Sequence, residues 1–231
     1  MSDPLGDSIS LVDYVGHYGD DLFIVNRARK SFGKKSEWNA QGHLRVVDQN
    51  RLTRMATLGH WTPFAHPVIT IAFKMPIFVA REWYRHTVGF VRDELSRRDV
   101  TTDPEFFVPT EWRVAPSPEE RHLRSGLAIS DRSKGMAIEA ASIADRALRT
   151  YQVLLEEGAA PEMARTVLPQ SMYTEFDETA SLAAYARLAG LRLSPDAQKE
   201  TRLYAEAVDA IIAPLFPYAW EALKLRERKT E

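Results

Sequence analysis

The chain has 231 residues, of which 45% are hydrophobic, and its formal net charge is −2. This balance excludes a general electrostatic hold on nucleic acid or anionic membrane, and the lack of any cysteine excludes disulfides, thiolate metal sites and a cysteine nucleophile. The length and the hydrophobic content allow a substantial core, and we expect one domain over residues 1–231.

The first part of the chain predicts an edge strand followed by two helices. Residues 9–15 have a strand pattern, and residues 20–29 predict a helix begun by an acidic cap. Apolar residues recur at helical spacing over residues 44–58, and Gly59 is a typical helix-ending glycine. His60 is therefore expected on a turn, and residues 62–66 in an ordered loop.

Residues 68–75 predict a half-buried strand because their apolar and polar residues alternate at period two. The residues expected on the buried face are Ile69, Ile71, Phe73 and Met75. Pro76 stops the strand and can open a helix at its first turn, so residues 76–86 are expected to turn from strand into helix.

The stretch from residue 80 to residue 98 crowds arginines, carboxylates and a histidine around an aromatic pair and a lone Ser96. Clustered arginine, serine and carboxylate side chains suit a phosphorylated, hydroxylated ligand. The simpler alternative is that Arg85 only complements the dipole at the end of its helix. The charged run from Arg92 to Arg98 that follows favours the ligand-binding interpretation over this alternative.

The second half of the chain is mostly helical in pattern. We expect helices within residues 118–158, 161–168, 177–191 and 195–215, the first with a long apolar stripe that marks it as a packing helix. Residues 33–42 and 101–118 are the least regular. The fold class expected is therefore α+β, helix-rich, with a modest sheet. Since no stretch approaches 18 uninterrupted apolar residues and no signal peptide is evident, we expect a soluble cytoplasmic protein.

Several collinear segments resemble the flavin-dependent thymidylate synthases. The family signature is Arg-His-Arg, about seven residues and then Ser, and here it stands as Arg85-His86-Thr87 followed by Glu94-Leu95-Ser96-Arg97-Arg98, with one extra residue between. Residues 60–66, 76–81 and 164–169 are similar to the family's H.TPFEH, PIFVARQW and AR.vLP segments, and residues 190–192 and 197–200 are similar to its lR....AQ.EI segment. The resemblance extends from about residue 20 to residue 223.

The resemblance implies a central twisted sheet flanked by helices and a homotetramer whose sites form between subunits. It also implies transfer of one carbon to C5 of dUMP, giving dTMP, with FAD as cofactor, NADPH as reductant and 5,10-methylenetetrahydrofolate as carbon donor. A chain without cysteine cannot attack C6 of the uracil with a thiolate, so the composition agrees with a flavin-dependent route.

Residue roles follow from the resemblance position by position. Arg192 would stabilise negative charge on the O2–N3–O4 edge of the uracil, although it could also be only a cation at a helix end. Ser96 is expected to give hydrogen bonds rather than to act as a nucleophile, because no general base adjoins it. The remaining implied substrate contacts are Glu82, Glu94, Arg97, Arg98 and Arg165, and the implied flavin contacts are His60, Thr62, Arg85, His86, Thr87, Val88 and Ser181. We expect no metal, since no HExxH-type spacing occurs.

The chain departs from the family pattern mainly on the flavin side. Thr87 and Ala183 replace arginines, Ala65 replaces a glutamate, Ser181 replaces an asparagine, and Glu82 stands in place of the usual glutamine. Two alternatives therefore remain beside dTMP synthesis. One is hydroxymethylation of a pyrimidine nucleotide, and the other is a catalytically inactive nucleotide- or flavin-binding paralogue.

Overall fold

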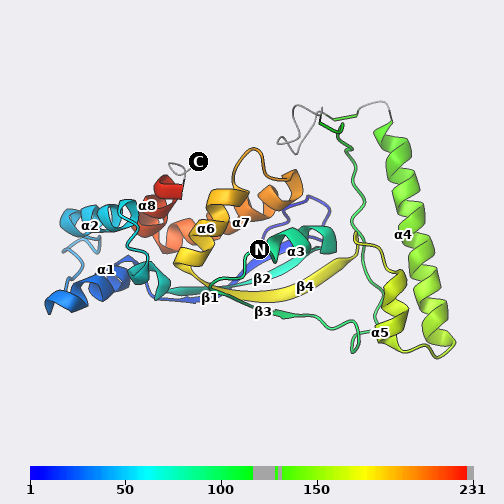
Figure 1. The fold of residues 1–231 in the computed structure, drawn as a ribbon, viewed down its shortest axis with the longest axis horizontal. Helices are drawn as coiled ribbons and strands as arrows, with labels where there is room; N and C mark the ends of the chain where they lie inside the picture. Colours follow the sequence, from blue (N-terminus) through cyan, green and yellow to red (C-terminus); the bar gives the residue numbers. More distant parts are fainter. Residues whose placement is uncertain (117–127, 130–131, 228–231) are drawn as a thin grey trace.

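Four antiparallel strands form the centre of the computed structural model, which describes residues 1–116, 128–129 and 132–227 (Figure 1). Their order in the sheet is β1 (Leu11–Tyr18), β2 (Val68–Pro76), β4 (Tyr173–Ser181) and β3 (Phe90–Glu94). The helices are α1 (Asp21–Arg29), α2 (Val46–Thr57), α3 (Ile77–Trp83), α4 (Ser133–Glu156), α5 (Pro161–Ala164), α6 (Leu182–Arg192), α7 (Lys199–Leu215) and α8 (Pro217–Glu227). Three short 3-10 turns, η1 (Lys30–Phe32), η2 (Thr62–Ala65) and η3 (Arg165–Val167), complete the elements. The expected α+β class is confirmed.

Helices α3, α6 and α7 cover one face of the sheet, α1, α2 and α8 lie at one end, and α4 and α5 lie at the other (Figure 1). The predicted buried face of β2 is confirmed, because Ile69, Ile71, Phe73 and Met75 are all at most 2% exposed. They pack in one hydrophobic cluster with Trp83, and burying each such side chain contributes about 1.5–3 kcal/mol.

The predicted start and end signals of the early helices are confirmed. Asp20 is the N-cap of α1, where its carboxylate accepts a hydrogen bond of 2.6 Å from the backbone N–H of Phe23. Gly59 follows α2 with a φ of 73°, the left-handed conformation that glycine adopts without strain. His60 lies just beyond that turn, as expected. The strand predicted at residues 9–15 is β1, which lies at the edge of the sheet.

The helix expected over residues 177–191 is wrong in its first part, because residues 173–181 form β4. In this stretch the buried Phe176, Glu178 and Ala180 alternate with more exposed neighbours. β4 pairs along its whole length with β2 on one side, and its residues 176–180 pair with β3 on the other. The backbone pairing of a central strand outweighs the local helical pattern, and helix α6 begins only at Leu182.

Other boundaries also differ from the prediction. Residues 118–127 and 130–131 lie outside the described residues, but Ala128 forms a bridge with Arg113 and α4 begins at Ser133, so the helix expected from residue 118 is wrong at residues 128, 129 and 132. Helix α7 begins at Lys199 rather than at residue 195. Strand β3 and helix α8 were not anticipated. The signature stretch therefore includes β3, a strand at the edge of the sheet.

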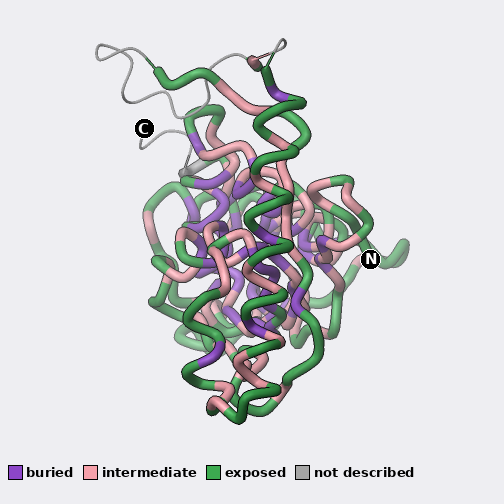
Figure 2. The backbone as a smooth tube through the Cα atoms, turned by 90° about the vertical axis from the view of Figure 1, so that its right-hand side faces the viewer, coloured by how far each residue is buried: buried purple, intermediate pink, exposed green. Residues whose placement is uncertain are grey.

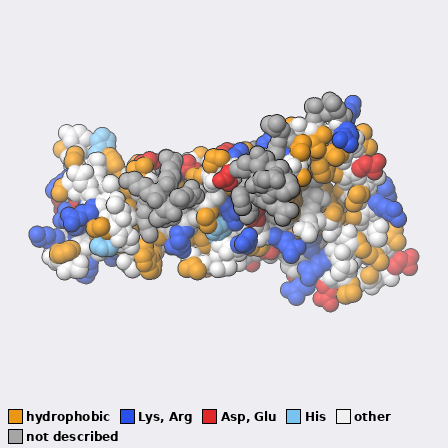
Figure 3. Space-filling view, turned by 45° about the horizontal axis from the view of Figure 1, so that its top comes forward, with side chains coloured by type: hydrophobic (Ala, Val, Ile, Leu, Met, Phe, Trp, Pro, Cys, Tyr) orange, Lys and Arg blue, Asp and Glu red, His pale blue; other side chains and the backbone are white. Residues whose placement is uncertain are grey.

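Helix α4 stands apart from the hydrophobic core. It contacts α5 and η3, and along its length only Ser133, Ala144 and Tyr151 are buried (Figure 2). Ile138 and Ile143 are 61% and 62% exposed. Figure 3 shows hydrophobic side chains gathered at this end of the molecule. The apolar stripe predicted for packing therefore stays largely uncovered within one chain.

Asp21 links α1 to α8 and makes the stability depend on pH. Its buried carboxylate accepts hydrogen bonds from the backbone N–H groups of Tyr218 (3.0 Å) and Ala219 (2.9 Å), and burial raises its pKa to about 6. Between about pH 4 and pH 6 the folded state holds a proton that the unfolded state has lost, so stability falls as the pH rises through this window. The difference is about 3 kcal/mol.

We therefore expect Asp21→Asn to remove this pH dependence, because an amide does not ionise. Urea unfolding of both proteins at fixed protein concentration between pH 4 and pH 7 measures it. The free energy of unfolding of wild type, relative to the variant, should decrease by about 3 kcal/mol as the pH rises. A pH-independent difference between the two proteins would contradict the assignment.

Candidate functional site

An ion pair joins the last turn of α6 to α3. The guanidinium of Arg192 donates from Nη1 to Oε1 of Glu82 at 2.6 Å and from Nη2 to the backbone oxygen of Glu82 at 3.2 Å. Both side chains are mostly buried, at 10% and 12% exposure. The two contacts fix the plane of the guanidinium, and the carboxylate compensates part of its charge.

His86 holds the same guanidinium from another side. Nε of Arg192 donates to Nε2 of His86 at 3.0 Å, and because arginine has only donors, His86 must accept at Nε2 and carry its hydrogen on Nδ1. Burial, with the positive charges of Arg192, Arg92 and Arg85, lowers the pKa of His86 to about 4. His86 is therefore neutral at pH 7 and can orient Arg192 in this tautomer.

Most of the predicted substrate contacts come together in a second place. A cavity of about 570 Å³ lies where β3 ends beside η3, and its lining includes Glu94, Ser96, Arg97, Arg98 and Arg165. Among the described residues, neither Arg98 nor Arg165 pairs with a carboxylate. Two uncompensated guanidiniums beside a hydroxyl offer charge-assisted donors to an anion such as a phosphate.

The other members of this cavity are held by neighbours. Glu94 accepts a hydrogen bond of 2.6 Å from the hydroxyl of Thr174, and Ser96 accepts one from the backbone N–H of Arg98 at 3.3 Å. Arg97 donates to the backbone oxygen of Thr102 at 2.6 Å. Ser96 and Glu94 are thus acceptors with fixed positions at the cavity wall. The side chain of Arg97 also anchors the segment around Thr102.

The turn after α3 meets the start of α6. Ser181 caps α6 by accepting from the backbone N–H of Ala184 at 3.2 Å, and its own N–H donates to the oxygen of Gly89 at 3.3 Å. Gly89 has a φ of 83°, and a Cβ there would lie 3.1 Å from Cβ of Ala184, so the close approach requires glycine. Val88, 75% exposed, is held here by its backbone oxygen, which accepts from Arg187 at 2.8 Å.

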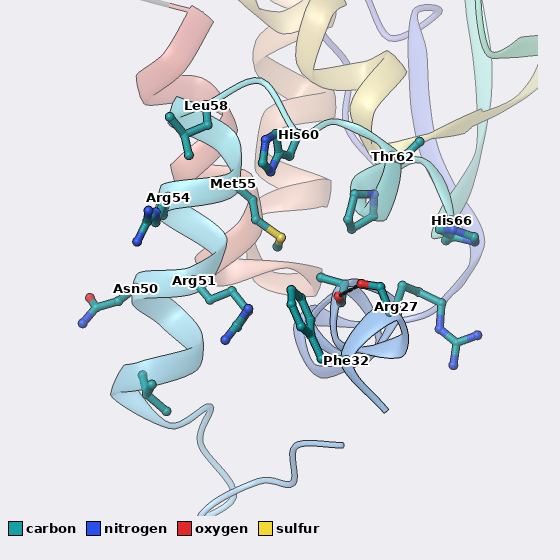
Figure 4. Close-up of a pocket in the computed structure, with 14 residues that line it drawn as sticks. Arg27, Phe32, Asn50, Arg51, Arg54, Met55, Leu58, His60, Thr62 and His66 are labelled. Atoms are coloured by element: carbon teal, nitrogen blue, oxygen red, sulfur yellow. Dashed lines mark hydrogen bonds between the residues drawn. The ribbon is translucent and has the colours of Figure 1, made fainter. Parts of the chain in front are cut away.

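The predicted flavin residues are only partly brought together. Thr87, Val88 and Ser181 share this turn with Arg85 and His86. His60 and Thr62 lie elsewhere, in a cavity of about 720 Å³ between α1, α2 and η2 (Figure 4). In Figure 1 this cavity's elements and the end of β3 lie toward opposite ends of the sheet. One chain therefore separates the residues that the resemblance places around one reaction centre.

The sequence analysis missed a buried ion pair between Arg92, which lies within the signature stretch, and Glu178. Glu178 is fully buried on β4 and accepts from Nε of Arg92 at 2.5 Å and from Nε1 of Trp83 at 3.2 Å. The guanidinium of Arg92 lies 5.0 Å from the ring centres of Tyr84 and Phe90. Burial raises the pKa of Glu178, although Arg92 and Trp83 oppose the shift. The alternation of residues 173–181 was the signal that could have found it.

Two classes of site are not formed by the described residues. In residues 1–116, 128–129 and 132–227, no group of three histidine, aspartate or glutamate side chains is placed to hold a metal ion. Within the same ranges, each helix is too short or too polar to cross a lipid bilayer.

The sequence matches one family over most of its length. The sequence model of the family described as "Thymidylate synthase complementing protein" matches residues 10–218. A flavin-dependent thymidylate synthase of Thermosipho africanus is 33% identical over 225 residues, which cover 93% of this chain and 89% of the relative. The protein of that name from Thermus thermophilus is 33% identical over 213 residues, covering 92% of this chain and 75% of the relative.

A solved structure is also similar. The UMP/dUMP methylase PolB from Streptomyces cacaoi, bound with 5-Br UMP, superimposes with a TM-score of 0.81 at 26% sequence identity. The match covers 95% of each chain. A second structure of PolB, bound with 5-Br dUMP, matches equally well.

Proposed function

The chain belongs to the flavin-dependent thymidylate synthase family, and from this premise we propose that it transfers one carbon to C5 of dUMP to give dTMP. The carbon donor in this proposal is 5,10-methylenetetrahydrofolate, the cofactor is FAD and the reductant is NADPH. The observation that carries the proposal is the cavity in which unpaired Arg98 and Arg165 lie beside Ser96 and Glu94. It offers two cations for a phosphate and fixed acceptors for the rest of a nucleotide.

Arg192 is proposed to activate the uracil. A C5 carbon becomes a better nucleophile when negative charge on the O2–N3–O4 edge is stabilised, and a guanidinium with a fixed orientation does so without reorganising during the reaction. Glu82 and neutral His86 supply that orientation through three hydrogen bonds. They are positioning residues in this proposal. This role for Glu82 differs from the substrate contact expected by resemblance.

The residues of the α1/α2 cavity fit a flavin nucleotide. Thr62 and His60 line a space of about 720 Å³, and Nε of Arg51 is buried there without a hydrogen-bond partner. A cavity of this size accommodates a large part of a cofactor, and the orphaned donor calls for an acceptor. When bound, the reduced flavin supplies the reducing equivalents that turn the transferred carbon into a methyl group.

One assay tests the reaction and its alternatives. Purified protein with FAD, NADPH, methylenetetrahydrofolate and dUMP should yield dTMP, and mass spectrometry identifies the product. A product heavier by one oxygen would favour hydroxymethylation, and no product despite dUMP binding would favour an inactive paralogue. UMP is tested in parallel, because PolB is named for action on both nucleotides.

We also propose that the protein is a homotetramer whose sites combine residues of different subunits. Support comes from the exposed apolar side chains of α4 and from the separation of the two cavities within one chain. Exposed apolar surface of this kind is typical of an interface. The particle mass should then be about four times 26.2 kDa.

Ile143→Asp is expected to dissociate this assembly, because it places a charge where an apolar contact is needed. Light scattering after size exclusion measures the mass of both proteins. Arg149→Ala is the matched control, since Arg149 lies on the same helix but forms an exposed ion pair with Asp145. A wild-type monomer, or equal masses for wild type and Ile143→Asp, would contradict this assignment.

A further inference from the structure

Glu82 and Arg192 form an ion pair at the place assigned above to the edge of the base. Nη1 of Arg192 donates to Oε1 of Glu82 at 2.6 Å, and the two side chains are only 12% and 10% exposed. Because solvent screens charges weakly in such a place, the carboxylate cancels much of the field that the guanidinium would produce alone. A ligand therefore meets a neutral pair rather than a bare cation.

The carboxylate of Glu82 stands at a position where the resemblance leads us to expect the amide of a glutamine. A glutamine could accept the same hydrogen bond from Arg192, but it would not supply a counter-ion. The carboxylate accepts that hydrogen bond, adds a negative charge and has no N–H donor. The departure thus changes the net charge of the site while the size of the side chain stays the same.

The neighbours of the pair hold its two members together. The backbone oxygen of Glu82 accepts from Nη2 of Arg192 at 3.2 Å, and Nε of Arg192 donates to His86 at 3.0 Å. From α7, the fully buried hydroxyl of Thr201 makes a weak contact of 3.5 Å with Oε2 of Glu82. Since these contacts come from several elements, we expect the carboxylate to stay beside the guanidinium when a nucleotide binds.

The other charged groups around the pair change this balance little. Burial, together with the surrounding arginines, lowers the pKa of His86 to about 4, so His86 adds no charge at pH 7. Arg92 has its own counter-ion, because it pairs with Glu178 at 2.5 Å. Arg85 is exposed, so water and salt screen its charge. Glu82 is therefore the group that sets the charge beside Arg192.

The protonation state of the base decides how it meets this pair. Neutral uracil presents N3–H as a donor between two oxygens, so a carboxylate can accept from the N–H while a guanidinium donates to an oxygen. Loss of the N3 proton puts a negative charge on this edge, which a guanidinium attracts and a carboxylate repels. An ion pair therefore suits the neutral base better than its anion.

We propose that Glu82 is a specificity-determining residue that restricts the site to the neutral, N3-protonated form of a pyrimidine base. The inference rests on the proposed function, which places the edge of the base beside Arg192. It concerns the protonation state of the bound nucleotide, so it holds for any of the one-carbon products considered above. Arg192 keeps its role during the reaction, because Glu82 offsets the charge of the guanidinium but leaves its donors in place.

Calorimetric titrations of the full-length protein between pH 7 and pH 9 test the proposal without relying on turnover. The probe is 5-Br dUMP, because the bromine withdraws electrons and N3–H ionises at a lower pH than in dUMP. We expect the affinity of wild type for 5-Br dUMP to fall by about 10-fold over this range, and that of Glu82→Gln to fall by less than about 2-fold. Titration with dUMP, which stays largely protonated, controls for ionisation of protein groups.

The protons exchanged on binding give a second readout. Titrations at pH 8.5 in two buffers of different ionisation enthalpy measure how many protons the complex takes up. Wild type should take up a proton when it binds ionised 5-Br dUMP, because it accepts only the neutral base, and Glu82→Gln should not. A residue that only supports the fold would leave this proton uptake unchanged.

Two further variants show whether the charge of the pair is what matters. Glu82→Gln combined with Arg192→Gln again gives a neutral pair, so it should regain the pH dependence of wild type even though it binds more weakly. Glu206→Gln is the matched control, because Glu206 is an exposed residue that pairs with Arg202 on α7 at 3.4 Å. It should keep the pH dependence of wild type. Thermal unfolding shows that each variant is folded.

Equal pH dependence in wild type and Glu82→Gln would overturn the proposal, and so would an equal loss of affinity at every pH, since Glu82 would then only support the site. The failure of this inference is separate from failure of the proposed function. If wild type forms dTMP but binds both protonation states of 5-Br dUMP equally, only the role of Glu82 is wrong. If wild type neither binds dUMP nor forms dTMP, the proposed reaction fails as well.

Discussion

Arg192→Ala is expected to lower the turnover number for dTMP formation by about 10²–10³-fold, the loss typical of removing one fixed donor that stabilises charge in a transition state. The variant should bind dUMP with less than about a 10-fold change, because the phosphate contacts are assigned to the separate cavity of Arg98 and Arg165. The loss should therefore appear in kcat rather than in KM. Steady-state kinetics with dUMP as the varied substrate measure both parameters.

Two further variants separate the catalytic role from a structural one. Arg192→Lys keeps a positive charge but cannot reproduce three hydrogen bonds to Glu82 and His86, so it should recover only part of the rate. Arg202→Ala on α7 removes a partly exposed arginine that pairs with Glu206 at 3.4 Å, and it should leave kcat unchanged. An Arg192→Ala enzyme with wild-type kcat would remove Arg192 from its assigned role.

Glu178→Ala should cost about 3–5 kcal/mol of folding stability, because it leaves the guanidinium of Arg92 without its counter-ion in a largely buried place. It also leaves the indole N–H of Trp83 without its acceptor. Glu178→Gln keeps an acceptor and should cost about 1–3 kcal/mol. Urea unfolding at one fixed protein concentration measures these differences, since assembly changes the apparent stability.

Glu175→Ala is the control from the same strand. Glu175 is exposed and pairs with Lys74 at 3.0 Å, so its loss should change stability by less than about 1 kcal/mol. The double variant Arg92→Met with Glu178→Leu should recover much of the stability lost in Glu178→Ala, because apolar side chains of similar size often replace a buried ion pair at little cost. A Glu178→Ala protein as stable as the control would show that the buried pair is not a stabilising contact.

Local signals predicted the early elements well. The alternation of residues 68–75, the carboxylate of Asp20 and the glycine at position 59 each act over a few residues, so their physical effect is readable from spacing alone. Residues 173–181 were misread as partly helical because a central strand is selected by its two partner strands, which lie far away in the sequence.

The residues of the candidate site also fall into two groups, those that the sequence identified and those contacts that only the structure revealed. The resemblance named the residues of the Arg98 cavity and those around Arg192, and the structure brings each of these sets together. It could not reveal that Glu82 pairs with Arg192, that Arg92 pairs with Glu178, or that the arginines of α1 and α2 share one cavity with His60. The two ion pairs join residues that are tens of positions apart, and no short-range pattern encodes them.

The sequence by itself determined the family, the α+β class, the lack of a thiol nucleophile and the residues that carry the signature. Only the tertiary structure decided which charges neutralise each other and which stay unpaired. The physical reason is that the energy of a charge depends on its distance from other charges and from water, and folding alone sets both. Arg29 and Arg51 show this, since only the fold gives one of them a carboxylate and leaves the other facing an open cavity.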